Sequence, residues 1–370
     1  MEIAIVHDWL TGMRGGEKVL MALLELFPRA DIFTLVYRPE KVDPAFRERR
    51  VTASFLQRLP LGKTKYQYYL PLYWELMRGL DLSKYDLVIS SSSACAKWVK
   101  VPKTATHVCY CHTPMRYIWD QFDDYFGPSA NPLVRLSARM FQPYLQRCDL
   151  KSNSGVTNFI ANSTEVQERI KRIYGRDSDI FHPPVDVDRF KVKSGKGEYY
   201  LVISALVPYK KVDMAVRVCT KRNLPLVVVG QGPEEARLRQ LAGPTVSFKG
   251  WASDAELPAY YEKAKALLFP GKEDFGIVPV ESLASGCPVI AFGEGGVLDT
   301  VKDGESGVLY RERTDEALSA AIDRFEKMDF DPQALRQKAM SFSRDRFLFK
   351  MQVYFRKLYG AAVNEENLKV

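Results

Sequence analysis

The second half of the chain alternates short apolar segments with helical ones, and this alternation restricts the possible folds more than any other feature. The apolar segments are rich in Val, Leu, Ile and Phe and lie at 198–206, 225–230, 245–250, 266–271 and 288–292. Helical patterns separate them, at 211–219, 233–242, 255–264 and 278–286. Short apolar strands that alternate with helices of about ten residues predict a parallel sheet covered on both faces.

The first half repeats this order less regularly. An apolar run at 2–10 leads through the glycine-containing loop 12–16 into a helical pattern at 17–27. Short apolar strands that stop at small or polar residues follow at 85–93, 106–112 and 158–164. The aromatic segment 113–145 is predicted to be rich in loops.

Two consecutive prolines mark a boundary between the halves. Pro183 and Pro184 exclude a helix and favour an extended crossing. The sequence therefore predicts an α/β protein with two Rossmann-like domains, residues 1–188 and 189–344, followed by a helical tail. Ligands of open parallel sheets bind at the carboxyl ends of the strands, so we expect the two domains to face each other across a cleft that holds the site.

Length and composition are those of a globular, non-spanning protein. The chain has 370 residues, of which 46% are hydrophobic, enough for a substantial core. Apolar runs stay shorter than the roughly 18 residues of a membrane span, and the N-terminus lacks the pattern of a signal peptide. We therefore expect a cytoplasmic protein. Its six cysteines are expected to be reduced, because a chain of this size does not need disulfides.

The tightest group of metal-ligand residue types is Cys109-Tyr110-Cys111-His112. Zinc sites normally pair two such groups, and the second group is missing. The alternation of residue types is more typical of a strand that runs into a loop. We expect no bound metal.

The net charge of +8 is concentrated in one region. Residues 47–103 carry eleven Lys and Arg against four Asp and Glu, together with the aromatic stretch 66–77. Basic charge mixed with aromatic residues suits an anionic membrane surface. A solvated basic face beside a core helix is the alternative. No sequence pattern of a nucleic-acid-binding module is present, so nucleic acid is not expected as a partner.

Glu273 and Glu281 bracket a Phe-Gly turn between an apolar strand and a helix. Pro279 suits the start of that helix, where its missing N–H is not needed. Gly276 and Ile277 would present backbone N–H groups at the positive end of the helix, which attracts phosphate. The spacing fits a nucleotide sugar, with Glu281 on the ribose and Glu273 on the sugar. The alternative is that Glu281 serves its own helix and Glu273 is solvated.

Two further loops suit an anionic ligand. Lys210 and Lys211 follow a strand and open a helix, where positive charge is unfavourable unless an anion offsets it. The loop 12–16 can bring backbone close to a ligand, although it lacks the spacing of a bound NAD or FAD. A surface lysine pair and a simple tight turn are the respective alternatives.

These motifs resemble the GT-B glycosyltransferases of family 4, which are retaining enzymes that use nucleotide-sugar donors. The resemblance covers nearly the whole chain and rests on the Glu273 to Glu281 signature and on the phrases at 159–164, 182–190, 227–234 and 246–251, in family order. The segments 15–17, 112–120 and 204–213 are most similar to bacterial mannosyltransferases of O-antigen and exopolysaccharide assembly, which use GDP-mannose. The family also implies that the C-terminal helix, 345–370, packs back on the first domain.

The resemblance implies a role for each matching residue of the donor site. Glu273 would bind the hydroxyls of the donor sugar, and Glu281 those of the ribose. Phe275, Gly276 and Ile277 would contact sugar and phosphate through their backbone.

Other residues would act on the diphosphate, the base and the acceptor. Lys210 would stabilise charge on the leaving nucleotide, and His112 would lie beside the donor sugar. Gly15 and Gly16 would complete the phosphate site from the first domain. Phe248 and Lys249 would border the base. Acceptor contacts are expected from Asp8, Arg116 and Tyr117.

One departure from the family concerns the diphosphate. Many members have Gly-Arg where this chain has Ser204-Ala205, and Ala205 cannot hold a phosphate. Either Lys211 or Arg14 would have to replace the arginine. A lysine can supply the charge but not a bidentate contact.

The resemblance implies transfer without a metal and with retention of configuration, in which the departing phosphate takes the proton of the acceptor. The acceptor is expected to be a lipid-linked saccharide. Alternatives are a UDP-sugar donor, another GT-B activity such as a nucleotide-sugar epimerase or a phosphorylase, and a non-catalytic scaffold that binds a nucleotide sugar.

Overall fold

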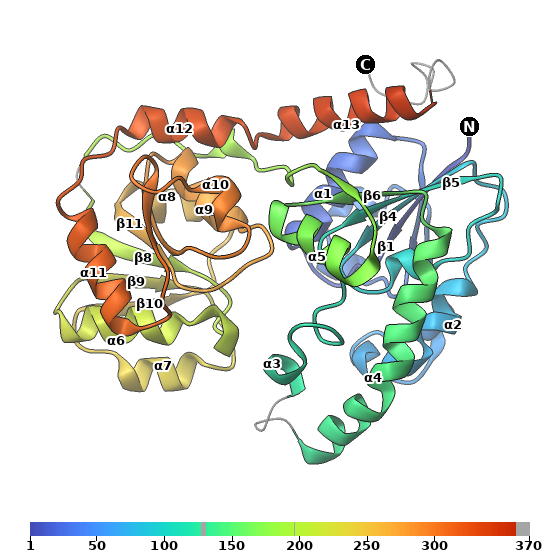
Figure 1. Cartoon of the computed structure of the whole chain (residues 1–370), viewed down its shortest axis with the longest axis horizontal. Coiled ribbons are helices and arrows are strands. Elements are labelled where there is room, and N and C mark those ends of the chain that lie inside the picture. The colour runs from blue at the N-terminus through green and yellow to red at the C-terminus, as the bar shows by residue number, and fades with distance from the viewer. Residues whose placement is uncertain (127–130, 196, 360–370) are drawn as a thin grey trace. The chain divides into compact units, whose positions relative to one another are not determined.

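The structure, a computed structural model, describes residues 1–126, 131–195 and 197–359 and contains two compact units (Figure 1). The first unit comprises Met1–Pro184 and the segment from Phe347 onward, and the second comprises Val185–Arg346. Each unit holds one sheet whose strand pairs are all parallel. This confirms the predicted fold class of two Rossmann-like α/β sheets.

The sheet of the first unit has the strand order β3-β2-β1-β4-β5-β6-β7. Its strands are β1 (Ile3–His7), β2 (Asp31–Thr34), β3 (Val51–Ala53), β4 (Leu87–Ser92), β5 (Thr106–Cys111), β6 (Asn158–Ala161) and β7 (Ser178–Ile180). The strands expected near 85–93, 106–112 and 158–164 are confirmed. Because β2, β3 and β7 have only three or four residues, they give too little pattern to be predicted.

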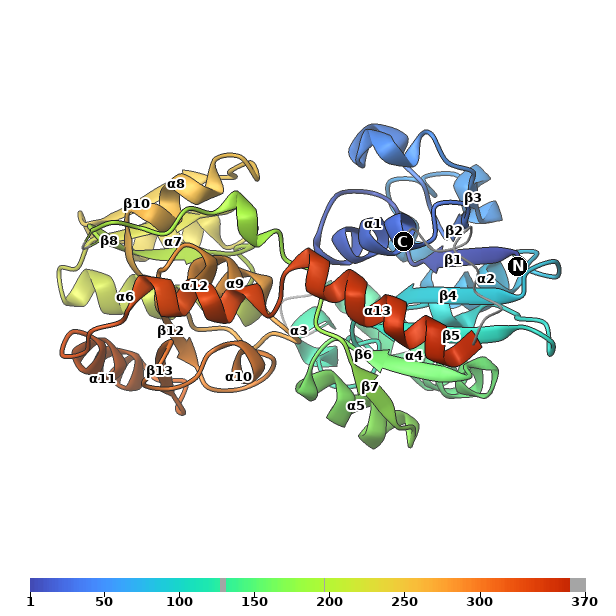
Figure 2. The same ribbon diagram turned by 90° about the horizontal axis from the view of Figure 1, so that it is seen from above.

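Helices cover both faces of this sheet. They are α1 (Gly15–Leu26), α2 (Tyr73–Arg78), α3 (Phe122–Phe126), α4 (Pro132–Ser152), α5 (Thr164–Tyr174) and α13 (Arg344–Tyr359). Figure 2 shows α13 passing over the strands of this sheet. Its Phe347, Met351 and Phe355 are buried in one core cluster with Phe27 at the end of α1. Burial of each such side chain contributes about 1.5–3 kcal/mol, and residues 360–370 of the expected C-terminal helix lie outside the described residues.

The segment 113–145, predicted to be rich in loops, contains most of a long helix instead. α4 has 21 residues, and the side chain of Asn131 caps it by accepting from the N–H of Leu133 at 2.9 Å. The prediction was wrong for two reasons. Pro143 lies inside the helix, where proline normally breaks one. In addition, apolar residues occupy more than one side of α4, which hides the helical period.

The sheet of the second unit has the strand order β10-β9-β8-β11-β12-β13. Its strands are β8 (Tyr199–Ile203), β9 (Leu226–Val229), β10 (Val246–Gly250), β11 (Ala264–Phe269), β12 (Val289–Phe292) and β13 (Gly307–Tyr310). β8 pairs with β9 on one side and β11 on the other, so the strand order reverses there. Loops that leave the carboxyl ends of strands at such a point diverge and leave room for a ligand.

Two groups of helices cover this second sheet, as predicted from the alternation. They are α6 (Val212–Lys221), α7 (Glu235–Leu241), α8 (Leu257–Glu262), α9 (Ile277–Ala284), α10 (Val297–Thr300), α11 (Asp315–Phe325) and α12 (Pro332–Met340). Residues of α8, α9, α10 and α12 share one core cluster, and residues of α6, α7 and α11 share the other (Figure 1). The expected helical tail is confirmed.

A buried polar cluster in the first unit centres on Asp149 of α4. Asp149 Oδ1 lies 2.7 Å from Lys97 Nζ and accepts from the indole N–H of Trp98 at 3.0 Å. Its Oδ2 accepts from the indole N–H of Trp119 at 2.7 Å and from the hydroxyl of Tyr174 at 2.8 Å. A buried ion pair is tolerated only when its remaining hydrogen-bonding capacity is satisfied, as it is here. The cluster ties the loop after β5, which includes Trp119, to α4 and α5.

The basic aromatic stretch within 47–103 is divided between core and surface. Tyr66, Tyr73 and Trp74 are buried, whereas Tyr68 and Leu72 are exposed. Part of this stretch therefore belongs to the core, and contact of its exposed part with a membrane stays a prediction.

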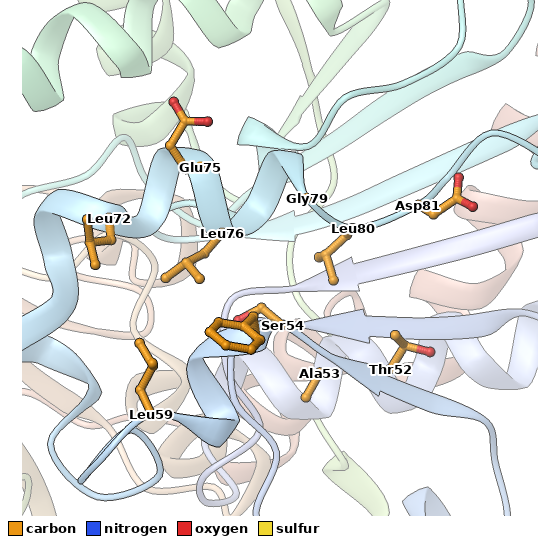
Figure 3. Close-up of a pocket in the computed structure, with 11 residues that line it drawn as sticks. Thr52, Ala53, Ser54, Leu59, Leu72, Glu75, Leu76, Gly79, Leu80 and Asp81 are labelled. Carbon is orange, nitrogen blue, oxygen red and sulfur yellow. The ribbon is translucent and has the colours of Figure 1, made fainter.

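An open pocket of about 540 Å³ lies beside the same stretch. Figure 3 shows Ala53, at the end of β3, and Leu59, after the short helical turn that follows, on one side of it and Leu72, Leu76 and Leu80 on the other. Most of its lining is apolar.

Across the described parts of the chain, every helix is too short or too polar to traverse a bilayer. The six cysteines, all within these parts, are buried and free of disulfides. Cys109 and Cys111 lie on β5, as the strand reading of the Cys-Tyr-Cys-His sequence predicted.

His107 of β5 is fully buried between two hydrogen-bond partners. Its Nδ1 lies 3.1 Å from the carbonyl oxygen of Gly155, and its Nε2 lies 2.9 Å from the hydroxyl of Ser90. Because a carbonyl only accepts, Nδ1 carries the proton and Nε2 accepts from Ser90. Burial lowers the pKa of His107 to about 4.

This burial predicts a pH dependence of stability. The unfolded chain takes up a proton at His107 near pH 6.5, whereas the folded chain does so only near pH 4. The free energy of unfolding therefore falls as the pH drops through this window, by roughly 3 kcal/mol in total from this group. We expect His107→Gln to show a smaller loss between about pH 7 and about pH 5 in urea unfolding. Parallel losses in the variant and the wild type would contradict this assignment.

Candidate functional site

Three loops meet at the carboxyl edge of the second sheet. They follow β8, β11 and β12 and carry Lys210, the segment 273–276 and the pair Gly295-Gly296. A side chain at Gly271 would come within 3.0 Å of the Lys210 backbone, so glycine is needed where the first two loops touch. The N–H of Gly296 donates to the carbonyl of Glu273 at 2.9 Å and joins the third loop to the second.

The close approach of these loops pairs Lys210 with Glu273. The two side chains form an ion pair and are only 15% and 20% exposed. Lys210 and Glu273 lie 63 positions apart in the sequence (273 − 210) and were predicted separately. Each side chain neutralises the charge of the other.

The N-terminus of α9 begins directly after this pair. Gly276 precedes the helix with φ of +87°, a conformation that favours glycine, and it provides no side-chain cap. The backbone N–H groups at this end are suited to an anion. Phe275 is 3% exposed, and its side chain packs in the core. Contact of its backbone with a ligand stays a prediction.

Glu281 is buried rather than open to solvent. It is 5% exposed, and its two carboxylate oxygens lie 3.0 Å from Arg189 Nη2 and 3.1 Å from the hydroxyl of Tyr261. Arg189 also pairs with Asp254 at 2.8 Å. Neither partner was predicted, because both lie far from Glu281 in the sequence. Contact between Glu281 and a ribose stays a prediction, and any such contact must share the carboxylate with Arg189 and Tyr261.

The loop after β8 departs from the family pattern at Ser204 and Ala205. The hydroxyl of Ser204 donates to the carbonyl of Ala205 at 3.1 Å. Lys211 lies at the N-cap of α6 with φ of +54°, a strained conformation for a residue other than glycine. Strain of this kind is common at ligand sites. Arg14, the other candidate to replace the arginine, is exposed in the first unit.

The residues expected to border a base lie on the edge strand β10. Phe248 is half-buried against α7, where the guanidinium of Arg239 lies 4.8 Å from the centre of its ring. Lys249 is exposed. Trp251, which follows the strand, is 70% exposed. Trp251 was not among the predicted site residues. Its place directly after the glycine that ends β10 is the sequence signal that could have identified it as a candidate.

In the first unit, Gly15 and Gly16 begin α1 after the carboxyl end of β1. A Cβ atom at Gly16 would lie 3.4 Å from the His7 ring and 3.6 Å from the His112 ring, so both imidazoles lie directly beside this residue. Glu17 accepts from the N–H of Arg14 at 2.9 Å and caps this end of α1.

His112 belongs to a chain of polar groups at the ends of β1, β4 and β5. Its Nε2 lies 2.8 Å from the hydroxyl of Ser91, which lies 3.1 Å from Nδ1 of His7. His7 Nε2 in turn faces the buried carboxylate of Glu17 at 3.9 Å. A hydroxyl has one proton, so Ser91 can donate to one ring and accept from the other.

Charge on Glu17 is favoured by this arrangement. Burial raises the pKa of Glu17, but its hydrogen bond and charge interaction with His7, and backbone N–H groups, together bring the pKa below its usual value.

Ser91 was not predicted, although the run of serines at 90–93 that ends β4 was visible in the sequence.

The three acceptor candidates have different surroundings. Asp8 is 2% exposed, and its carboxylate accepts from the N–H groups of residues 93–96 and from the Ser93 hydroxyl at 2.6–3.0 Å. These five donors occupy the carboxylate, so we assign Asp8 a structural role instead of the expected acceptor contact. Arg116 accepts from two N–H groups of its own turn through its carbonyl, and the ring of Tyr117 packs 5.8 Å from that of Tyr125.

A metal site can be assessed only for the described residues. Among these, no group of three or more His, Cys, Asp or Glu side chains lies close enough to hold a metal ion. Independence from metal ions stays a prediction.

Two models of known protein families match the chain. Residues 13–189 match the model described as Glycosyltransferase Family 4, and residues 185–342 match the one described as Glycosyl transferases group 1. One similar protein is the GDP-mannose-dependent alpha-(1-6)-phosphatidylinositol monomannoside mannosyltransferase of Mycolicibacterium smegmatis, 29% identical over 53% of this chain and 57% of that protein. Another is the D-inositol 3-phosphate glycosyltransferase of Thermomonospora curvata, 29% identical over 42% of this chain and 46% of that protein. The chain thus matches about half the length of these relatives.

Solved structures show the same fold. Sucrose-phosphate synthase from Thermosynechococcus elongatus superposes with a TM-score of 0.71 and 18% identity, over 98% of this chain and 100% of that chain. Anabaena Alr3699/HepE in complex with UDP and glucose superposes with a TM-score of 0.67 and 17% identity, over 96% of this chain and 99% of that chain. Since the two family models adjoin and together span residues 13–342, the chain belongs to the group 1, family 4 glycosyltransferases with the GT-B fold.

Proposed function

We propose that the protein is a retaining glycosyltransferase that moves mannose from GDP-mannose to a lipid-linked saccharide in O-antigen or exopolysaccharide synthesis. The observation that carries the proposal is the Lys210–Glu273 pair beside the uncapped start of α9. It supplies a cation and helix N–H groups for a diphosphate, and a carboxylate for sugar hydroxyls, at one point of the sheet edge.

In this proposal donor binding opens the ion pair. Lys210 turns to the diphosphate, and Glu273 accepts hydrogen bonds from hydroxyls of the mannose. The bond from the anomeric carbon to the phosphate oxygen breaks, and a bond to the acceptor oxygen forms on the same face. The acceptor proton passes to the leaving phosphate oxygen. Lys210 and the N–H groups of Gly276 and Ile277 stabilise the charge on that phosphate, so no metal ion is required.

The first unit contributes His112 and the phosphate-facing glycines in this scheme. His112 lies beside the donor sugar, oriented by Ser91, and Gly15 and Gly16 leave room for the diphosphate. Arg116 and Tyr117 remain acceptor candidates. The protein would act at the inner face of the plasma membrane, with the exposed part of the 47–103 stretch against the lipid.

The donor assignment rests on relatives named as GDP-mannose-dependent. A UDP-sugar is the second candidate, since structures of similar fold hold UDP or UDP-glucose. The first test is calorimetric titration with GDP, UDP, dTDP and ADP, in EDTA and then in Mg²⁺. We expect GDP to bind most tightly in both. Tighter binding of UDP would overturn the donor, binding only with Mg²⁺ would overturn metal independence, and binding of none would overturn the proposal.

Glu273 and Glu281 provide a second test, because they are assigned to different parts of the donor. We expect Glu273→Gln to lower kcat at least about a hundredfold, while GDP binds as well as or better than in the wild type because Lys210 is released. Glu281→Gln is expected to weaken GDP binding instead. A thermal melt of both variants checks the fold. Loss of GDP affinity in Glu273→Gln, or unchanged turnover, would contradict the roles and favour a non-catalytic scaffold.

Two adjacent buried serines test the orientation of His112. Ser91 bonds His112, whereas Ser90 bonds the buried His107. Ser91→Ala removes the bonds to His112 and to His7, and Ser90→Ala removes the bond to His107. Each such bond is worth about 1 kcal/mol. We expect Ser91→Ala to lower kcat about fivefold with little change in KM, and Ser90→Ala to lower stability but leave kcat unchanged. Equal losses of kcat would mean that the core, and not His112, is affected.

A further inference from the structure

Helix α4 of the first unit carries two apolar stripes, and only one of them faces the core. Leu145 and Cys148 are buried, and Phe141 packs against the same cluster. The other stripe consists of Leu133, Leu136, Met140 and Tyr144, which are 77%, 68%, 68% and 39% exposed. Spacings of three and four residues place these four side chains on one side of the helix.

The second stripe lies largely outside the core. The four side chains follow one another along more than three turns, and a row of this kind is unusual on a protein that functions alone in water. A soluble helix normally has polar residues on the side away from the core. We define these four residues as the outer stripe.

The charges on α4 are unbalanced in a way that bears on the partner of the outer stripe. The basic residues of the helix are Arg135, Arg139, Arg147 and Lys151. Arg139, Arg147 and Lys151 are exposed, and Arg135 is half-buried. The one acidic residue of the helix, Asp149, is buried and paired with Lys97. The helix therefore presents only positive charge to the outside.

Neighbouring elements extend this surface and add little negative charge. Lys151 Nζ lies 5.9 Å from the Trp74 ring of α2. Leu72, 48% exposed, directly precedes α2 and lines the apolar pocket of Figure 3. The described side chains of the adjoining helices include two exposed acidic ones, Glu75 of α2 and Asp123 of α3.

We propose that the outer stripe of α4 docks on an anionic lipid bilayer. Aliphatic anchors flanked by arginine and lysine are the pattern of helices that lie in the interface, with their apolar face among the acyl chains and their cations among the headgroups. Only Tyr144 of the outer stripe offers a flat ring on which a base could stack, and the other three side chains are aliphatic, so nucleic acid fits less well. A second copy of the chain would bring four like charges against four.

The outer stripe itself lies outside the basic stretch 47–103, although Lys151 brings α4 next to Trp74 of that stretch. The stripe was hidden in the sequence because α4 was not recognised as a helix. The proposal does not rest on the identity of the donor or the acceptor. A chain that bound no nucleotide could still dock in this way.

Co-sedimentation with vesicles tests the proposal on the full chain. Vesicles of equal parts phosphatidylglycerol and phosphatidylcholine are compared with vesicles of phosphatidylcholine alone. We expect stronger binding to the anionic vesicles, weakened by salt. The double variant Leu136→Ser/Met140→Ser is expected to bind at least about tenfold more weakly. Arg139→Glu/Arg147→Glu is expected to lose a similar factor on anionic vesicles only.

Matched controls come from the second unit. Leu298→Ser removes a comparably exposed leucine. Lys221→Glu/Lys327→Glu reverses two exposed lysines, one at the end of α6 and one in the turn after α11. Neither should change binding. Thermal melts and GDP titration, which need no vesicles, should be the same in every variant, so a failure of the donor assignment cannot be mistaken for a failure of docking.

Three outcomes would overturn the proposal. Wild type that sediments with neither vesicle has no affinity for lipid. Stripe variants that bind like wild type place the contact elsewhere. In the third outcome, size-exclusion chromatography shows that the wild type is a dimer and the stripe variants are monomers. This result would assign the surface to a second copy of the chain.

Discussion

The parallel direction of all strands is the constraint on which both candidate half-sites depend. When every strand of a sheet points the same way, the loops at one edge all follow carboxyl ends. β8 and β11 lie next to each other although two other strands separate them in the sequence, and this neighbourhood brings Lys210 to Glu273. β1, β4 and β5 are also neighbours, and their ends bring His7, Ser91 and His112 together.

Buried carboxylates show how the same chemical group serves different purposes in this fold. Asp8 and Asp149 have all their hydrogen-bonding capacity taken up by protein donors, which fixes loops after β4 and β5. Glu281 is equally buried but lies one turn into α9, beside the proposed phosphate position. Glu273 has a single ion-pair partner in the structure and is partly open. A carboxylate held by one lysine can exchange it for a ligand, whereas one held by five donors cannot do so without a large cost.

In the first unit, hydrogen bonds to serines of β4 hold two histidines in different surroundings. His107 and His112 belong to the same short segment, and adjacent serines of β4 bond them. Successive side chains of a strand point to opposite faces, so Ser90 and Ser91 reach different surroundings. One histidine is sealed in the core and neutral, and the other reaches the sheet edge beside Gly16. The Asp149 cluster holds the loop that follows His112 through Trp119.

The sequence by itself determined the α/β class, the strands with regular patterns and the motifs of the donor site, because these depend on local periodicity and on residue types at fixed spacing. Most candidate site residues were recognisable in this way, including Glu273, Lys210, His112 and Gly16. Contacts between residues far apart in the chain were decided only by the tertiary structure. It gave Glu281 its partners Arg189 and Tyr261, and it occupied Asp8 with donors from a distant loop. It also showed that α4 is a helix. Burial of one apolar stripe stabilises this helix, whatever residues the other stripe contains. Local pattern reports which residues could be buried, and only packing decides which of them are.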